Sequence, residues 1–123
     1  YLETQEGRRL PVVHCIEGSE GHELFGETAK QVRQGDIIID KPSFGSMELA
    51  RIAAEKGYER IELVGLVSNI CVLTNAALLK TALPEAEITV DAACTASFDP
   101  RANTVALDSM ESIQINVINR KDK

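Results

Sequence analysis

The stretch from Arg60 to Leu83 constrains the fold of this chain more than any other part of the sequence. A short apolar run over residues 61–64 predicts a buried strand, which Gly65 interrupts. After Asn69, apolar residues return at helical spacing and predict a helix; they include Val72, Leu73, Ala76 and Leu79. The stretch therefore predicts a strand, a tight turn and a helix in immediate succession.

Cys71 lies in the first turn of this predicted helix, after two residues that can cap a helix N-terminus, Ser68 and Asn69. Free backbone amides and the partial positive charge of a helix N-terminus favour a thiolate and can hold an oxyanion. Cys71 is thus a candidate nucleophile. The residues alone leave a second interpretation open, in which Cys71 is a small apolar side chain packed under the helix.

The rest of the chain alternates helices and strands. We expect further helices over 22–34, 46–56 and from Asp99 onward, and further strands over 36–41, 87–91 and 113–118. We expect loops over 1–21 and 92–97 and a solvated tail over 120–123. By the right-handed crossover rule, this order predicts an α/β fold with a four-stranded parallel sheet and helices on both faces.

Composition limits the class of protein and its partners. A chain of 123 residues, 44% hydrophobic and 26% charged, is typical of one soluble domain. A net charge of −6 without a basic cluster argues against nucleic acid and anionic membranes as partners. No apolar run reaches the roughly 20 residues that span a bilayer. Three cysteines without zinc-type spacing fit a reducing cytoplasm, and we expect one of them, Cys94, to be packed.

The chain begins with Tyr1 rather than Met, and its first ten residues are typical of a polar surface loop. Domains seldom begin in this way. We therefore expect that an N-terminal segment is missing and that the intact protein begins about 50 to 60 residues earlier, within the usual size of one domain.

The segment G-L-V-S-N-I-C-V, from Gly65 to Val72, resembles the nucleophile turn of the isochorismatase-like cysteine hydrolases, the superfamily that includes nicotinamidases. The resemblance covers nearly all of residues 10–119. It implies a cis peptide bond between Leu66 and Val67. It also implies an oxyanion hole formed by the backbone amides of Val67 and Cys71.

Lys41 follows the predicted strand over 36–41 at its carboxyl end, where ligands bind in open α/β sheets. A lysine in this place is often only a solvated charge. The segment D-K-P-S-F, however, resembles the one that supplies the family's catalytic lysine. The resemblance implies that the Lys41 cation favours the thiolate of Cys71 and that Phe44 walls the substrate pocket.

His14 and Cys15 are followed by a Gly-x-x-Gly turn that resembles a nicotinamidase segment in which the histidine binds a metal. The resemblance implies a divalent metal such as zinc, with His14 as one ligand and most other ligands upstream of this chain. The residues alone favour a loop histidine bonded to backbone. Where nicotinamidases often have a tryptophan, this chain has Pro11, Val12 and Val13.

The resemblance implies a hydrolase of small amides that works through a thioester, as in the conversion of nicotinamide to nicotinate, and a homo-oligomeric state. The family sheet has six parallel strands, of which this chain offers the last four, so residues 1–123 would be the C-terminal two-thirds of one domain. The family's catalytic aspartate lies on a missing strand, so we expect the fragment alone to be inactive. A related hydrolase of another small substrate and a non-catalytic α/β module that binds a ligand or partner are the alternatives.

Overall fold

The computed structural model describes residues 1–123, which divide into two compact units, Tyr1–Ile38 and Ile39–Lys123. The single-domain organisation of the chain stays a prediction. No helix in either unit has the length and apolar character that crossing a membrane requires.

The first unit contains only short helices: α1 (Gln5–Arg9), the 3-10 turn η1 (Glu20–His22) and α2 (Gly26–Lys30). The predicted loop over 1–21 is therefore wrong at α1, where the Thr4 hydroxyl caps the helix by accepting from Gly7 N. Of the helix predicted over 22–34, only α2 is α-helical in the structure. Helices this short depend on packing, and the neighbouring Phe25 is 91% exposed.

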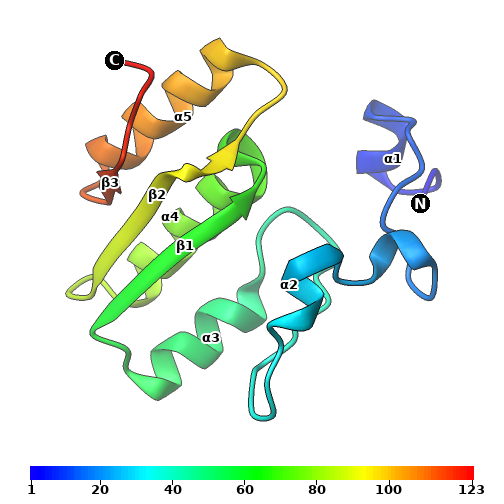
Figure 1. Ribbon diagram of the computed structural model, residues 1–123, viewed down its shortest axis with the longest axis horizontal. Helices are drawn as coiled ribbons and strands as arrows, with labels where there is room; N and C mark the ends of the chain where they lie inside the picture. The colour runs from blue at the N-terminus through cyan, green and yellow to red at the C-terminus, as the bar shows by residue number, and fades with distance from the viewer. The chain divides into compact units, whose positions relative to one another are not determined.

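The second unit is an α/β fold built on a parallel sheet (Figure 1). In chain order its elements are α3 (Met47–Lys56), β1 (Arg60–Leu66), η2 (Ser68–Val72), α4 (Leu73–Ala82), β2 (Glu87–Ala96), α5 (Pro100–Ser112) and β3 (Asn116–Ile118). The strands pair in the order β1-β2-β3. The predicted parallel α/β class is confirmed.

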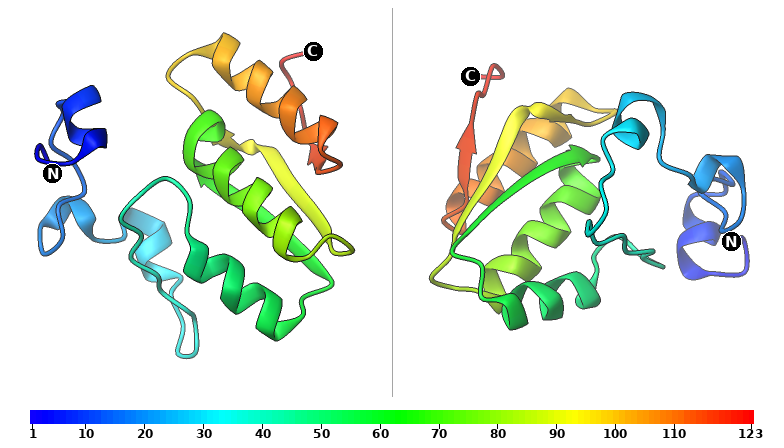
Figure 2. Two further views of the ribbon diagram at one scale, coloured as in Figure 1. Left: turned by 180° about the vertical axis from the view of Figure 1, so that it is seen from behind. Right: turned by 60° about the horizontal axis from the view of Figure 1, so that its bottom comes forward.

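The helices of this unit cover one face of the sheet, not both. The α4 and α5 helices pack on the same face of the sheet, and α3 lies beside α4 (Figure 2). Ile88 and Val90 on β2 are buried beneath them, with exposures of 1% and 0%. On the opposite face, Val64 and Leu66 of β1 are 58% and 68% exposed. The core therefore forms a single layer between the sheet and the helices.

The predicted strand over 36–41 is wrong, so the sheet has three strands instead of four. Its residues pair with no strand, and Ile37 and Ile38 are 51% and 66% exposed. A run of β-branched residues gives only a preference for extended structure, since a strand forms through its pairing with a neighbour.

The predicted loop over 92–97 is instead largely strand, because β2 continues beyond an irregularity. Leu63 pairs with Val90, and the next pairing joins Gly65 to Thr95, so β2 carries extra residues at this point. The Asp91 carboxylate accepts a hydrogen bond from Ala93 N at 2.9 Å inside this bulge. Bulges of this kind kink a strand without ending it.

The ends of two helices agree with the sequence prediction. Ser46 caps α3 through its hydroxyl, which accepts from Leu49 N at 3.0 Å. Gly57 ends α3 with a φ of 64°, a left-handed conformation that glycine adopts without a steric penalty. Asp99 caps α5, with Pro100 as the first helical residue.

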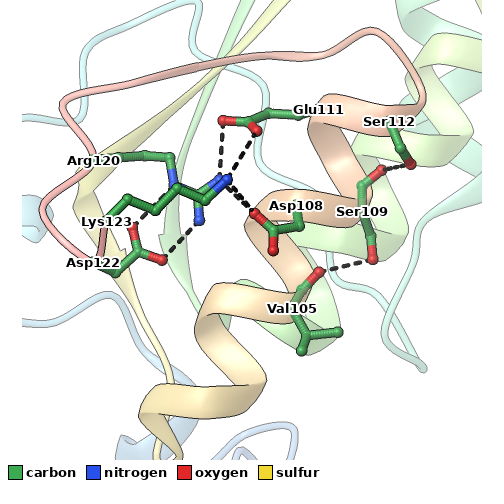
Figure 3. Close-up of polar contacts among 8 residues, drawn as sticks. All are labelled: Val105, Asp108, Ser109, Glu111, Ser112, Arg120, Asp122 and Lys123. Carbon is green, nitrogen blue, oxygen red and sulfur yellow. Dashed lines mark hydrogen bonds and ion pairs between the residues drawn. The ribbon is translucent and has the colours of Figure 1, made fainter.

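Residues 121–123 are exposed, as expected for a solvated tail, but Arg120 anchors the tail to α5 (Figure 3). The Arg120 side chain is only 10% exposed. Its guanidinium bonds Asp108 at 2.9 Å and Glu111 at 3.0 Å, and it holds Asp122 through two nitrogens at 2.7 and 2.9 Å. Lys123 adds a contact to Asp108 at 2.8 Å. Such a two-pronged contact between arginine and carboxylate is the geometry that makes ion pairs strong.

These contacts change the titration of the carboxyl groups. Hydrogen bonds from Arg120 hold the pKa of Asp122 well below its ordinary value. Hydrogen bonds from Lys123 and then Arg120 lower the pKa of Asp108. A carboxyl group whose pKa is lowered in the folded state stabilises the fold above its unfolded pKa, and this contribution is lost as the pH falls.

We expect an Arg120→Met variant to lower the melting temperature by a few degrees at pH 7, because the carboxylates on α5 and in the tail lose their common partner. The difference from the wild type should narrow as the pH falls below the ordinary carboxyl value of 3.8. Thermal unfolding followed by circular dichroism at pH 7, 4 and 3 measures this difference. An equal difference at all three pH values would contradict the role given to Arg120.

Candidate functional site

The site is built around the turn that joins β1 to α4. The peptide bond between Leu66 and Val67 is cis, as the resemblance implied. The five residues of η2 then form a π-helical turn that contains Cys71 and leads directly into α4. Turns of the π type are frequent at functional sites. Cys71 is half-buried and lies at the sheet edge where parallel strands end.

Ser68 does not cap this helix, contrary to the sequence expectation, and neither does Asn69. Val67 is the capping residue and no side chain accepts a hydrogen bond there. Ser68 is fully buried, and its hydroxyl instead donates to Asn103 Oδ1 on α5 at 2.6 Å. The Oδ1 atom of Asn69 is buried and accepts no hydrogen bond. The nucleophile turn is therefore fixed to α5 by a side-chain bond that helix-capping rules do not foresee.

Lys41 meets Cys71 although the two are 30 residues apart in the sequence. The Lys41 Nζ atom is 3.4 Å from the Cys71 Sγ atom. The same ammonium group donates to the carbonyl of Ser43 at 3.0 Å. A cation this close to sulfur is placed to attract negative charge that develops on that atom. The structure thus brings together the two residues that sequence reasoning assigned to catalysis.

Asn75 is the polar residue at this site that sequence reasoning missed. It lies on α4, four residues after Cys71, and its side-chain amide bonds the carbonyl of Cys71 at 2.9 Å. One feature of the sequence could have indicated Asn75. It is an amide side chain four residues after Cys71 on a helix face that is otherwise apolar.

Phe44 and Val67 occupy positions near this centre, and their assigned roles stay predictions. Phe44 lies on the loop that carries Lys41 and is 41% exposed. Its backbone carbonyl accepts a hydrogen bond from Asn75 at 3.2 Å. Val67 immediately precedes η2, and Cys71 lies within that turn. The oxyanion role of the amides of Val67 and Cys71 rests on this placement.

His14 lies in an exposed loop of the first unit. Its Nδ1 atom bonds the carbonyl of Val12 at 2.6 Å, and the ring of Tyr1 meets it edge-on at 5.0 Å. Across residues 1–123, no group of three or more His, Cys, Asp or Glu residues is placed to hold a metal ion. The residues present offer His14 alone, and its geometry is that of a loop histidine bonded to backbone. A metal held by His14 and ligands upstream of this chain stays a prediction.

The other two cysteines, Cys15 and Cys94, are exposed, and none of the three forms a disulfide. The expectation that Cys94 is packed is therefore wrong: the residue lies where the register of β2 shifts, next to Ala93, which is exposed as well. The neighbouring Asp91 carboxylate raises the pKa of the Cys94 thiol. This cysteine thus has an anion beside it where Cys71 has a cation.

A cavity of about 310 Å³ lies away from Lys41 and Cys71, between β2, α5 and the end of the chain. Its lining consists of Ala92, Ala93, Asn103, Leu107, Asn119, Lys121 and Asp122. Asn103 connects this lining to the nucleophile turn through its bond with Ser68. None of the residues predicted for catalysis lines the cavity.

Two of the solved structures similar to this one are named as nicotinamidases. The nicotinamidase/pyrazinamidase of Bacillus subtilis shares 25% identity over 95% of this chain and 68% of its own, with a TM-score of 0.81. The nicotinamidase of Staphylococcus aureus shares 26% identity over 88% of this chain and 71% of its own, with a TM-score of 0.76.

A third structure supports the fold alone. The pyrazinamidase of Pyrococcus horikoshii, solved in complex with zinc, shares 21% identity over 88% of this chain and 62% of its own, with a TM-score of 0.74. No curated protein sequence matches the chain. The sequence model of the isochorismatase domain matches residues 1–122. On the breadth of that match, the chain belongs to the isochorismatase family.

Proposed function

We propose that this chain carries the nucleophile of a cysteine hydrolase that cleaves small amides, as nicotinamidases do. The observation that supports the proposal most directly is the 3.4 Å contact between Lys41 Nζ and Cys71 Sγ at the end of β1. The similarity to the nicotinamidases of B. subtilis and S. aureus points to the same class of substrate.

In the proposed reaction, the sulfur of Cys71 attacks the carbonyl carbon of the amide and forms a tetrahedral oxyanion. The amides of Val67 and Cys71 stabilise this oxyanion, and the Lys41 cation stabilises the attacking thiolate. The intermediate collapses with loss of ammonia, which carries away the proton first removed from the thiol. Water then cleaves the thioester to release the carboxylic acid and regenerate Cys71.

The proton of Cys71 needs a basic acceptor, which Lys41 cannot be while it is an ammonium ion. The Lys41 ammonium group donates to Cys71 Sγ and so cannot take a proton from it. We therefore propose that the acceptor is the family's aspartate, which the sequence analysis assigned to a strand outside this chain. On this proposal the 123 residues alone hold a reactive thiol but do not turn over substrate.

The choice of amide depends on the walls of the pocket. Phe44 is the aromatic residue on the Lys41 loop, and we propose that its ring contacts the substrate. Pro11, Val12 and Val13 replace the tryptophan that nicotinamidases often have, which favours a small amide or carbamoyl compound other than nicotinamide as the alternative substrate. A cytoplasmic location and a homo-oligomeric state stay predictions from the sequence.

The first test concerns the reactivity of Cys71. We expect iodoacetamide at pH 7 to alkylate Cys71 faster than Cys15 and Cys94, with rates read from peptide masses. A Lys41→Met variant should slow the alkylation of Cys71 by about tenfold, because it removes the cation that favours the thiolate. A Lys56→Met variant, which removes an exposed cation at the end of α3, is the matched control. Equal rates for all three cysteines would contradict the proposal.

A second test uses Cys94 as the opposite case. Because the Asp91 carboxylate raises the pKa of the Cys94 thiol, an Asp91→Asn variant should lower that pKa and increase the thiolate fraction at pH 8. Alkylation of Cys94 should then become several times faster, while Cys15 in the same sample stays at its wild-type rate. An unchanged Cys94 rate would show that Asp91 does not control this thiol.

The third test measures the reaction itself. We expect the complete gene product to release ammonia from at least one member of a panel of small amides that includes nicotinamide. A Cys71→Ala variant should lose this activity by about 10³-fold or more, since the thioester cannot form. Ammonia release that survives in Cys71→Ala, or a panel on which the wild type is inactive, would overturn the proposed function.

A further inference from the structure

We propose that Asn75 is a positioning residue that holds the lysine loop, residues 41–46, against the nucleophile turn and so sets the contact between Lys41 and Cys71. This inference rests on the proposed function, since it concerns how the same site is assembled. The side chain of Asn75 forms hydrogen bonds with both segments that meet at the site, the lysine loop and the turn that contains Cys71.

The side chain of Asn75 uses both donors and its acceptor across this junction. Its Nδ2 donates to the carbonyls of Cys71 at 2.9 Å and Phe44 at 3.2 Å. Its Oδ1 accepts from the backbone amide of Ser46 at 2.9 Å. These partners fix the orientation of the amide, because a flipped side chain would place oxygen against two carbonyls and nitrogen against an N–H. One buried side chain thus links the turn to the loop at three points.

The lysine loop is short and is anchored at both ends. Ser46, which is 6% exposed, both accepts from Leu49 N to cap α3 and donates its own amide to Asn75. At the other end, the ammonium of Lys41 bonds the carbonyl of Ser43 within the loop as well as the sulfur of Cys71. The position of the Lys41 cation therefore depends on where Asn75 holds Phe44 and Ser46.

Gly45 gives independent support for close contact between the loop and α4. A Cβ atom built on Gly45 would lie 2.7 Å from Thr74 Cγ2 and 2.7 Å from Leu78 Cδ1. Thr74 cannot easily rotate away, because its hydroxyl donates to the carbonyl of Ile70 at 2.6 Å. Only glycine fits at this distance, so the loop packs on α4 beside the residues that flank Asn75.

The burial of Asn75 separates this role from ordinary surface bonding. Asn75 is 9% exposed, whereas the other two buried residues of α4 are Ala76 and Leu79. An amide in an apolar layer is costly unless its hydrogen bonds are made, and here they are made to the two segments of the site. The polar groups of Asn75 therefore join the two segments of the site from a buried position on α4.

The decisive experiment measures how strongly Lys41 and Cys71 remain coupled when Asn75 is changed. Alkylation of Cys71 by iodoacetamide is followed from pH 6 to 9 in the complete gene product and in Asn75→Leu, each with and without Lys41→Met. We expect Lys41→Met to slow alkylation by about tenfold in the wild-type background and by less than twofold in Asn75→Leu. A full tenfold effect of Lys41→Met in folded Asn75→Leu would overturn the inference.

Two further variants separate positioning from stability. Gly45→Ala should push the loop off α4 and so reduce the factor by which Lys41→Met slows Cys71 alkylation, which we call the Lys41 effect. This variant replaces Asn75→Leu in the experiment if Asn75→Leu fails to fold. Leu79→Ala removes a core side chain from the same helix without touching the loop, so it should lower thermal stability but leave the Lys41 effect intact. Loss of the Lys41 effect in Leu79→Ala as well would mean that stability alone explains the result.

Hydrogen exchange distinguishes failure of this inference from failure of the proposed function. The amide of Ser46 reports the bond to Asn75 directly, whatever the chemistry of Cys71. We expect its protection relative to the Ile88 amide to fall at least tenfold in Asn75→Leu and to persist in Leu79→Ala. If Lys41→Met leaves wild-type alkylation unchanged, the proposed function fails, whereas unchanged Ser46 protection in Asn75→Leu overturns the positioning role.

Discussion

The packing of α4 against β2 holds the helix on which the candidate site is built, and hydrogen bonds of Asn75 join the lysine loop to that helix. Ala76 and Leu79 of α4 join Ile88 and Val90 of β2 in one core, and this contact fixes the helix on the sheet. The N-terminal end of the same helix is the turn that carries Cys71, and its side carries the amide that bonds the lysine loop. Because these features share one rigid element, the energy that folds the core also positions the chemistry.

The features that sequence reasoning predicted correctly are those with local causes. The strand, turn and helix around Cys71 follow from hydrophobic periodicity, and Ser46 and Gly57 are residues with a strong preference for helix ends. The cis bond after Leu66 came from a motif whose residues are contiguous. The meeting of Lys41 with Cys71 is a long-range contact, and it was reached through resemblance and not through periodicity.

The features that were missed depend on partners far away in the sequence. The apolar run over 36–41 resembles a strand by composition, but a strand exists only through its ladder. Arg120 looks like part of a charged tail, and nothing local indicates that α5 presents Asp108 and Glu111 to it. From the sequence alone, Asn75 is only a residue with weak helix propensity, because its contacts with the lysine loop come from the tertiary structure. In each case the structure is determined by contacts between residues that are distant in the sequence, and a short stretch of sequence gives no information on such contacts.

The contrast between Cys71 and Cys94 shows why exposure alone does not make a cysteine reactive. Cys94 is the more accessible of the two, yet the carboxylate of Asp91 raises the pKa of its thiol. Cys71 is half-buried and has the ammonium of Lys41 at 3.4 Å. Since the thiolate is the attacking form, the sign of the neighbouring charge bears on reactivity as well as access to solvent. The fold supplies opposite charges at the two positions, and the proposed function places the attacking sulfur in the turn between β1 and α4.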